Sequence, residues 1–429
     1  MNQGYHAQVN GINDENTCVV IGAGLVGLCT ALAFQRQGMR VMLVDKGQPS
    51  QGASYGNAGF LATELVDPLG TLSTLKQAPK LLLQRHGPLA VPLGNLHNSL
   101  PWMSRFALSS LPDAAARGRE ALSLLNRQAL TAWNSLLTRE NLQRHLVPSG
   151  YLRIWESAKG KSAARAEAAF LRQWGIKAVP LTAAEITDME PYLSRNVGHA
   201  LYFPDSCRVS DPYWLAEALF NAFIGRGGEF HQMNVAAVIP VGNSFNVQGD
   251  KQALHARHAL VCAGAKSAEL LAPLGFQIPL MAERGYHLSL ENECDLLRRP
   301  VCSAERNVFI NPLSSGLRIV GISELGGTAL PPNPRRYATL RHHACALIPS
   351  ADAKLKAAKE WMGMRPTLPD SLPVIDIHPD YPGLGFAFGH QHLGLTLAAV
   401  TAELIVSRML SVPGPDYIHQ LSISRFKRR

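Results

Sequence analysis

The order of apolar and polar residues at the start of the chain predicts a strand, a helix and a second strand. Residues 17–21 are mostly apolar and β-type, and a glycine turn separates them from a helical stretch at about 25–37. Another apolar run at 41–45 predicts the second strand. Two strands joined through a helix by short connections indicate a βαβ unit.

Helical patterns recur farther along the chain. Asp211 and Pro212 are typical of a helix start, with Asp as the cap and Pro at the first helical position. By contrast, residues 65–111 are rich in Pro, Gly and Leu and show only weak periodicity. The predicted helices lie at residues 112–139 and 162–174, after Asp211-Pro212, and at 394–410.

The middle of the chain predicts several strands. The stretch 278–291 alternates well enough for one long strand, and 308–310 and 317–321 are expected to be its neighbours. Shorter β-type runs lie at 235–240, 245–248 and 258–262. Strands and helices typical of a nucleotide-binding domain therefore occur at the start, middle and end of the sequence. This indicates two domains that are each discontinuous.

Composition places the chain among folded proteins. Of its 429 residues, 46% are apolar and 17% are charged. The 41 Lys and Arg exceed the 32 Asp and Glu, which favours an anionic partner such as a nucleic acid, an acidic membrane or a carboxylate substrate. No basic motif interleaved with aromatic residues occurs, so we expect no nucleic-acid partner.

The cysteines and the N-terminal residues bear on location. The 7 Cys are scattered and never spaced as C-x-x-C, so neither a disulfide framework nor a metal site is expected. The N-terminus has no basic segment followed by an apolar run, and no stretch reaches the about 18 uninterrupted apolar residues that span a bilayer. We expect a cytoplasmic protein, with contact to the inner face of the cell membrane as an alternative.

A glycine motif lies between the first predicted strand and helix. Gly22, Gly24 and Gly27 form G-x-G-x-x-G, in which the glycines serve a tight turn, close approach to a pyrophosphate and helix packing. The helix N-terminus offers free amides to phosphates. Asp45 ends the second strand, where a carboxylate binds the ribose hydroxyls of FAD or NAD rather than NADP.

The residues after Asp45 favour FAD over NAD. The run K-G-Q-P-S-Q-G-A-S-Y-G-N-A-G-F at 46–60 is polar and small, which suits a backbone that wraps closely around a large flat ligand. Two further unusual stretches, at 363–376 and 388–398, lie near the C-terminus.

With these stretches the sequence resembles the D-amino-acid oxidase superfamily of FAD-dependent oxidoreductases, and within it the bacterial D-amino-acid dehydrogenases. The resemblance runs the whole length of the chain. Its motifs are the βαβ fingerprint, S-x-G-N-A-G, Q-R-H-G-P-L-A, D-P-x-x-L, A-L-V-C-A-G-A-x-S, R-G-Y-H, G-x-R-P-x-x-P-D and G-H-x-x-L-G-x-T.

The resemblance implies a two-domain α/β (α+β) fold. A Rossmann-like FAD-binding domain is expected from residues 17–61, 206–275 and 363–415. A discontinuous substrate domain, built on a mixed or antiparallel sheet plus helices, is expected from 62–205 and 276–362. Residues 1–16 and 416–429 are then terminal extensions.

The resemblance also implies where FAD binds, with its ring at the domain boundary. The helix that begins near Gly394 has physical support of its own, because its positive end stabilises the negative charge of a reduced flavin. The cofactor-binding residues are expected to be Gly22, Gly24, Leu25, Val26, Gly27, Asp45, Lys46, Ser54, Asn57, Ala58, Gly59, Val235, Ala263, Gly264, Gly389, Gly394, Leu395 and Thr396.

One departure from a related group concerns attachment of the cofactor. Sarcosine-oxidase relatives attach flavin through a cysteine near the P-D segment. Here residues 363–367 read G-M-R-P-T and contain no thiol, so FAD is expected to be noncovalent.

Arg365 is expected to grip the substrate. Hydride transfer from Cα to flavin N5 requires that the substrate be held in one orientation, which a guanidinium bound to its carboxylate provides. Arg365 matches the family position for this clamp. Tyr286 is a second candidate for the same carboxylate, although a tyrosine on a sheet is commonly only packed.

Histidines complete the predicted catalytic set. His390 matches the family turn and could take the amine proton, because the amine must be neutral to release hydride. His392 replaces the Thr usual in the dehydrogenases, which leaves its role open.

The leucine-rich stretch 74–91 carries Lys76, Lys80 and Arg85, Trp102 and Phe106 follow it, and the chain ends in S-R-F-K-R-R. Such a segment could rest on an anionic membrane, as suits an enzyme that passes electrons to a quinone. The alternative is a leucine-rich lid over the substrate domain and a solvated basic tail.

Together these features predict oxidative deamination of a D-amino acid to a 2-oxo acid and ammonia, with electrons passed to a quinone or another carrier. The stereochemistry follows from the resemblance alone. One alternative is an O2-using oxidase of glycine, sarcosine or a proline-type secondary amine. Another is a flavin-binding subunit of a larger amine dehydrogenase.

Overall fold

The structure, a computed structural model, describes residues 16–426 and 428. Within these residues a six-stranded sheet has the order β10-β2-β1-β14-β21-β20. Neighbouring strands run parallel except at the edge strand β20, which is antiparallel to β21. The strands are β1 (Thr17–Ile21), β2 (Arg40–Asp45), β10 (Glu229–Gln232), β14 (His258–Val261), β20 (Val374–Ile377) and β21 (Leu384–Phe388).

Both faces of the six-stranded sheet are covered, as its buried strands require. Cys18 and Val20 of β1 pack into the helical core, whereas Val19 and Ile21 pack on the other side. The helical side holds α1 (Leu25–Arg36), α4 (Pro112–Arg139), α7 (Pro212–Gly225) and α11 (Gly394–Met409). The other side carries a small sheet of β11 (Val235–Val241), β12 (Ser244–Gly249) and β13 (Ala253–Ala256).

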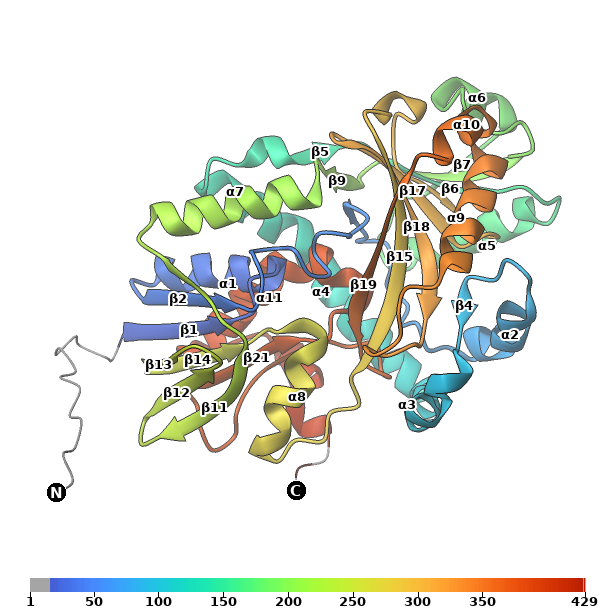
Figure 1. Cartoon of the computed structure of the whole chain (residues 1–429). Coiled ribbons are helices and arrows are strands. Elements are labelled where there is room, and N and C mark those ends of the chain that lie inside the picture. Colours follow the sequence, from blue (N-terminus) through green and yellow to red (C-terminus); the bar gives the residue numbers. More distant parts are fainter. Residues whose placement is uncertain (1–15, 427, 429) are drawn as a thin grey trace, which may run out of the picture.

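A second large sheet stands beside the first (Figure 1). Its order is β19-β15-β18-β17-β16-β6-β8-β7, with β4 paired to β18. Helix α9 (Pro334–Leu347) packs on one face of it. The strands are β4 (Leu89–Ala90), β6 (Tyr151–Trp155), β7 (Val179–Leu181), β8 (His199–Phe203), β15 (Met281–Glu291), β16 (Val301–Ser303), β17 (Val308–Leu313), β18 (Gly316–Glu324) and β19 (Lys359–Thr367).

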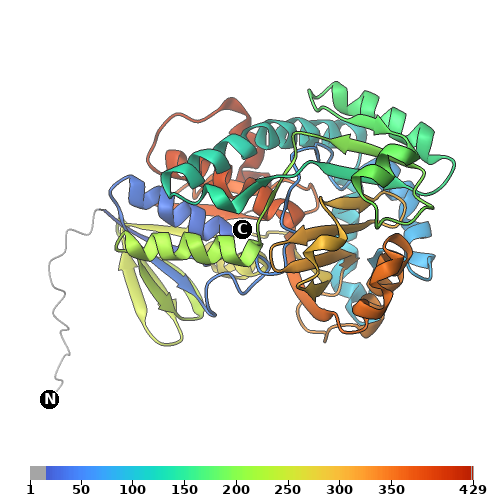
Figure 2. The same ribbon diagram turned by 90° about the horizontal axis from the view of Figure 1, so that it is seen from above.

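The remaining elements lie between and around these sheets. A three-stranded sheet joins β3 (Phe60–Leu61), β9 (Cys207–Val209) and β5 (Leu146–Pro148). Seen from above, the two large sheets lie at opposite ends of the molecule (Figure 2). The other helices are α2 (Leu72–Leu83), α3 (Leu96–Ser109), α5 (Gly160–Arg172), α6 (Ala183–Met189), α8 (Ser267–Leu271) and α10 (Asp352–Leu355).

The predicted α/β two-domain architecture is confirmed, with three differences in detail. First, β17 pairs with β18 and not with β15, so residues 308–310 are one strand farther from the long strand than expected. Second, residues 65–111 contain α2 and α3, which their weak periodicity did not predict. Third, the boundary placed at residue 363 falls inside β19, which pairs with β15 up to Thr367.

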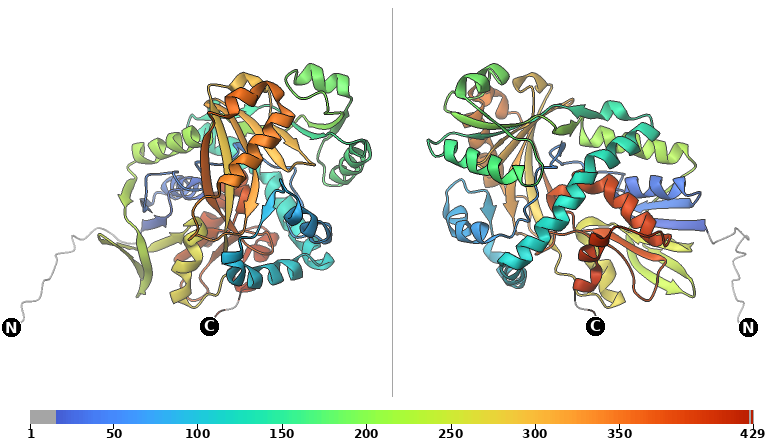
Figure 3. Two further views of the ribbon diagram at one scale, coloured as in Figure 1. Left: turned by 45° about the vertical axis from the view of Figure 1, so that its right-hand side comes forward. Right: turned by 180° about the vertical axis from the view of Figure 1, so that it is seen from behind.

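Helix α4 links the two halves of the molecule. It comes from the segment assigned to the substrate domain, yet it packs against α11, and Trp133 Nε1 donates to the carbonyl oxygens of Leu395 and Thr396. From behind, α4 runs diagonally across the molecule (Figure 3).

Among the described residues, one apolar helical stretch, Gln391–Met409, is long enough to cross a membrane. It contains α11, and 72% of it is buried inside the protein. Its apolar character is therefore accounted for by the core between α1 and α4.

Candidate functional site

The carboxyl ends of four parallel strands gather the predicted cofactor residues at one edge of the six-stranded sheet. Asp45 ends β2, Gly22 follows β1, Ala263 lies just after β14, and Gly389 follows β21. These strands are consecutive neighbours in the sheet. With about 4.8 Å between neighbouring strands, the four positions form a row suited to an extended dinucleotide.

The glycine turn after β1 has no room for side chains. A Cβ on Gly22 would lie 2.4 Å from the carbonyl oxygen of Cys262, and Gly22 has a φ of 117°. A Cβ on Gly27 would lie 1.8 Å from the carbonyl oxygen of Gly22. The turn is thus drawn tightly against β14, and main-chain atoms rather than side chains occupy the start of α1.

Polar groups around α1 fit a diphosphate and a ribose. Ser54 Oγ accepts a hydrogen bond from the Leu25 amide at 3.1 Å, so this serine lies at the helix start. The Asp45 carboxylate accepts from the amides of Ala23 at 2.9 Å and Gly47 at 3.1 Å. A phosphate oxygen would take the place of Ser54 Oγ as the acceptor for the Leu25 amide. Ribose hydroxyls would take the place of the amides that donate to Asp45.

The remaining predicted residues on this side lie at the rim. Leu25 is buried and Val26 is half-buried in the first turn of α1, and Lys46 is exposed beyond Asp45. Val235 begins β11 and is half-buried. Gly264 follows Ala263 with a φ of 57°.

The loop at residues 54–59 is fixed to the second sheet. Arg318 of β18 donates through Nη1 to the carbonyl oxygens of Tyr55 at 3.0 Å and Asn57 at 2.7 Å. Asn311 Nδ2 donates to the Ala58 carbonyl oxygen at 2.7 Å. A Cβ on Gly59 would lie 2.6 Å from Leu313. This loop therefore lies between the two sheets, as expected for residues beside a flavin.

A second helix start reaches the same edge. Gly389 has a φ of 83°, and a Cβ there would lie 2.4 Å from Leu368. Gly394 begins α11, and Thr396 Oγ1 accepts from the Ala62 amide at 3.0 Å. Two helix starts with glycines, that of α1 after β1 and that of α11 after β21, thus lie at this edge of the sheet. This donor set fits FAD: the amides at the start of α1 would hold its pyrophosphate, and the start of α11 would lie beside its flavin.

Arg365 lies on the face of β19 that bears on this edge. β19 contacts the turns at Gly264–Lys266 and Gln391–Leu393. The backbones of Thr367 and His390 form an isolated antiparallel β-bridge. Arg365 Nη1 donates to Glu283 Oε1 at 2.8 Å and is 3.4 Å from Ser323 Oγ. Within the described chain both contacts use Nη1, which leaves the Nε–Nη2 edge for a ligand carboxylate.

Two opposed glycines form the floor beside Arg365. Gly285 of β15 lies directly opposite Gly363 of β19. A Cβ on Gly285 would lie 2.6 Å from Arg365 Cζ, and one on Gly363 would lie 2.0 Å from the Trp361 ring. Arg365 and Trp361 therefore lie flat along the sheet, each over one glycine.

Trp361 forms a wall next to the Arg365 guanidinium. Its ring stacks on His287 with the centroids 4.8 Å apart, and a Cβ on Gly56 would lie 1.9 Å from it. Burial lowers the pKa of His287 to about 3, so this imidazole is neutral. A neutral aromatic wall suits a compact substrate side chain.

The expectation that Tyr286 binds substrate is wrong. Tyr286 is fully buried on the opposite face of β15, where its hydroxyl donates to Glu324 Oε1 at 2.9 Å. The Asn333 amide donates to the same hydroxyl at 3.3 Å, and the ring packs edge-on against Tyr337 of α9. Because side chains alternate along a strand, Glu283 and Gly285 face Arg365 and Tyr286 cannot.

The structure also corrects the role expected of His390. Its Nε2 lies 2.9 Å from Thr401 Oγ1, so the ring is held against α11 in the core rather than at the clamp. His392, two residues on, interacts electrostatically with Glu283 and Arg365. Burial lowers the pKa of His392 to about 4, opposed by Glu283 and assisted by Arg365, which leaves a neutral imidazole beside the clamp.

Two residues of this site, Glu283 and Trp361, carry only weak signals in the sequence. Glu283 lies at the start of the alternating strand that contains Tyr286. The opposite charges of Glu283 and Arg365 are the only sign in the sequence that the two could pair. Trp361 shares the alternation of Gly363 and Arg365. Neither pairing is visible without the register of β15 against β19.

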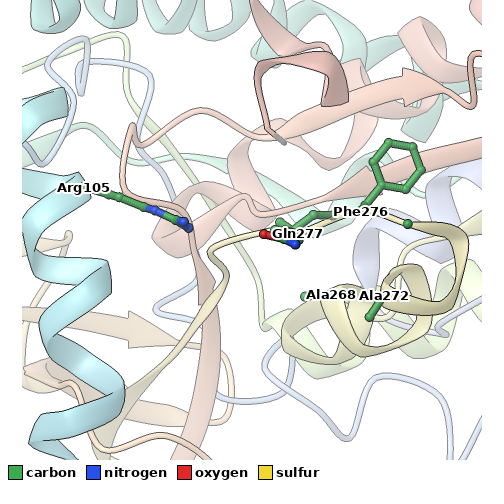
Figure 4. A pocket seen from close by; sticks show the side chains of 7 residues that line it. Arg105, Ala268, Ala272, Phe276 and Gln277 are labelled. Atoms are coloured by element: carbon green, nitrogen blue, oxygen red, sulfur yellow. The ribbon is translucent and has the colours of Figure 1, made fainter. Parts of the chain in front are cut away.

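A separate shallow pocket of about 430 Å³ opens between α3 and α8 (Figure 4). It is lined by Arg105, Ala268, Ala272, Gly275, Phe276, Gln277 and Ile278. None of these is a predicted site residue, and the clamp lies elsewhere. No group of three His, Cys, Asp or Glu in the described chain is arranged to hold a metal ion.

The chain is similar in sequence and in fold to known oxidoreductases. The chain is 30% identical over 403 residues to a D-amino-acid oxidase of Bradyrhizobium diazoefficiens, covering 92% of this chain and 95% of that one. It is 32% identical over 422 residues to D-amino acid dehydrogenase 2 of Ralstonia nicotianae, covering 93% and 98%. The fold is similar to that of glycine oxidase from Geobacillus kaustophilus, with a TM-score of 0.74, 21% identity and coverage of 95% and 98%.

A family model described as FAD dependent oxidoreductase matches residues 17–408, which include the glycine turn, the Arg365 clamp and the start of α11. The chain therefore belongs to the FAD-dependent oxidoreductase family.

Proposed function

We propose that this protein is an FAD-dependent D-amino-acid dehydrogenase. It converts a small D-amino acid to the imino acid, which water hydrolyses to a 2-oxo acid and ammonia. The observation that carries this proposal is that Nε and Nη2 of Arg365 donate to no group of the described chain, over the glycine floor and next to the edge of the sheet that fits FAD. FAD supplies the acceptor for the substrate hydride.

The residues of the chain have distinct tasks in this reaction. Arg365 binds the substrate carboxylate and so fixes the position of Cα. Trp361 limits the space for the substrate side chain and keeps water from it. Burial lowers the pKa of His392 to about 4, so this imidazole stays neutral and adds no charge next to the substrate amine.

Two relatives, at 30% and 32% identity, are named as acting on D-amino acids, which supports both the substrate class and its configuration. The test is anaerobic mixing of the flavin-loaded protein with matched D- and L-amino acids while the flavin absorbance is followed. We expect bleaching by a small D-amino acid and none by its L-enantiomer. Protein that binds flavin but bleaches with no amino acid would contradict the proposal and favour the non-catalytic subunit.

For the electron acceptor we propose a quinone or similar carrier rather than O2. The relatives include both an oxidase and a dehydrogenase by name, so the comparison leaves both acceptors to be tested. Turnover should require a quinone or dye and should give little hydrogen peroxide in air. Steady peroxide production at the rate of substrate loss would establish the oxidase instead.

We propose further that α2 and α3 rest on the anionic inner surface of the cell membrane. No residue of α2 is buried, Leu83 is 87% exposed, and Lys76 and Lys80 are exposed on the same helix. Figure 3 shows α2 and α3 at the same end of the molecule. Exposed leucines of this region are Leu69, Leu72, Leu82, Leu83, Leu96, Leu100, Leu108 and Leu111.

The basic C-terminal tail contributes less to this surface than its sequence indicated. Arg425 pairs with Asp370 at 2.7 Å, and Arg428 pairs with Asp380. Lys427, Arg429 and the N-terminal residues 1–15, the segment in which a secretory signal would lie, are outside the described residues.

Vesicle sedimentation tests the membrane contact. The protein should sediment with vesicles containing phosphatidylglycerol and much less with phosphatidylcholine alone. Leu83→Gln with Leu100→Gln should lower this binding about tenfold, whereas Val412→Gln, which changes a 53% exposed residue elsewhere, should not. Equal binding by all variants would place the contact elsewhere or remove it.

A further inference from the structure

The substrate clamp is an ion pair in the protein itself. Arg365 Nη1 lies 2.8 Å from Glu283 Oε1, and the two side chains are 24% and 8% exposed. Glu283 also accepts from Ser323 Oγ at 2.6 Å and from Thr367 Oγ1 at 2.8 Å. Burial opposes its ionisation, but Arg365 and the hydroxyl donors outweigh burial, so the pKa of Glu283 is lowered and the carboxylate is charged.

The other titratable groups near this face do not change the net charge of the clamp. His392 is neutral, as is His287. Arg318 is engaged with the carbonyl oxygens of Tyr55 and Asn57 and lies 3.9 Å from Asp211. The cluster of Arg284, Glu324 and Arg336 lies on the opposite face of the sheet. The clamp therefore presents one positive and one negative charge, with a net charge of zero.

A site of zero net charge discriminates between ligands by their own charge. An amino-acid zwitterion leaves the partly buried site neutral, whereas a simple carboxylate brings an uncompensated negative charge next to Glu283. A carboxylate has about four acceptor positions. Three of those of Glu283 are used by Ser323, Arg365 and Thr367, so one remains for a ligand ammonium.

Resting on the function proposed above, we infer that Glu283 selects zwitterionic amino acids over plain carboxylate anions, including the 2-oxo acid product. Arg365 alone would bind any carboxylate. The paired site binds the substrate through both of its charges. It releases the product once hydrolysis has turned a net-neutral ligand into a monoanion and ammonium.

Two ligands without an α-hydrogen test this inference by binding alone. 2-Aminoisobutyrate is a zwitterion, 2-hydroxyisobutyrate is an anion of nearly the same shape, and neither can give up a hydride from Cα. Their dissociation constants are measured by titrating the flavin-loaded protein and following the flavin spectrum. We expect the wild-type protein to bind the amino acid at least tenfold more tightly than the hydroxy acid.

The variants isolate the charge of Glu283. In Glu283→Gln the preference should fall at least tenfold, mainly because the hydroxy acid binds more tightly. Glu283→Asp keeps the charge and should keep the preference even if both ligands bind more weakly. Glu291→Gln should match the wild type, because Glu291 lies on the same strand as Glu283 but is 56% exposed and pairs with Lys359 of β19.

An unchanged preference in Glu283→Gln would overturn the inference, as would equal binding of both ligands by the wild type. The wild-type and Glu283→Asp measurements decide the matter if Glu283→Gln does not fold. A wild type that prefers 2-aminoisobutyrate but is bleached by no amino acid would contradict the proposed reaction and leave the charge selection standing.

Discussion

Strand β15 carries two arginine–glutamate pairs that differ in what covers them. Glu283 pairs with Arg365 on one face, and the next residue, Arg284, pairs with Glu324 on the other. Both N–O distances are 2.8 Å. The side chains of Arg284 and Glu324 are each 1% exposed, whereas that of Arg365 is 24% exposed.

The surroundings of the two ion pairs give them different roles. Glu324 also accepts from Arg336 Nε at 3.1 Å and from the Tyr286 hydroxyl, and α9 covers this face, so the pair is closed within the core. Arg365 instead lies over Gly285, and within the described chain its Nε and Nη2 donate no hydrogen bond. The chemistry of an ion pair thus does not fix its role. Access by a ligand does.

Arg365→Ala should produce the largest effect on function. Removing the guanidinium takes away the carboxylate grip, so kcat/KM should fall about 10³-fold, or ~4 kcal/mol of transition-state stabilisation. The flavin should stay bound. Steady-state kinetics and the flavin absorbance measure both. Arg40→Ala, which removes an arginine from an exposed pair with Glu229, serves as the control; equal kinetics in the two variants would remove Arg365 from the site.

Glu324→Gln should affect stability instead of substrate binding. It leaves Arg284 buried without its full counter-charge, which should lower the free energy of unfolding by about 3 kcal/mol. Chemical denaturation gives this value, and the folded variant should keep the wild-type KM. A large rise in KM with unchanged stability would mean that the two faces of β15 are not separate in function.

Gly285→Ala should shift the clamp without harming the fold. The new Cβ would lie 2.6 Å from Arg365 Cζ, the flexible end of a long side chain, so Arg365 must move while the backbone need not. We expect KM to rise about tenfold, or ~1.4 kcal/mol, with kcat less affected. Gly225→Ala, where a Cβ meets no atom within 4 Å, should leave KM unchanged.

Tyr286→Phe should have the smallest effect and separates the two faces most simply. It removes the hydroxyl that donates to Glu324 and accepts from Asn333, at a cost of about 1 kcal/mol of unfolding free energy. Substrate kinetics should not change. A fall in kcat/KM of tenfold or more would restore Tyr286 to the substrate site.

Local sequence patterns determined much of the fold. The βαβ start, the long helix at 112–139 and the Asp211 cap with Pro212 were predicted from periodicity and capping, and the structure confirms them at β1, α1, β2, α4 and α7. Helices α2 and α3 were missed because each contains a proline, Pro79 and Pro101, and because their leucines face outward. Patterns that reflect burial cannot identify helices that bury little.

The glycine turns at the edge of the six-stranded sheet could also be predicted, because each glycine motif serves the turn in which it lies. The substrate side could not. Glu283 and Arg365 are 82 residues apart, and only the register of β15 against β19 makes them partners.

The sequence by itself determined that an alternating strand runs through Tyr286 and that Arg365 belongs to an unusual motif. Only the tertiary structure decided that Glu283 faces the clamp and Tyr286 faces α9. The physical reason is that period-two alternation separates the residues of a strand into two sets but does not say which set a helix will cover. That choice depends on packing between segments far apart in the chain.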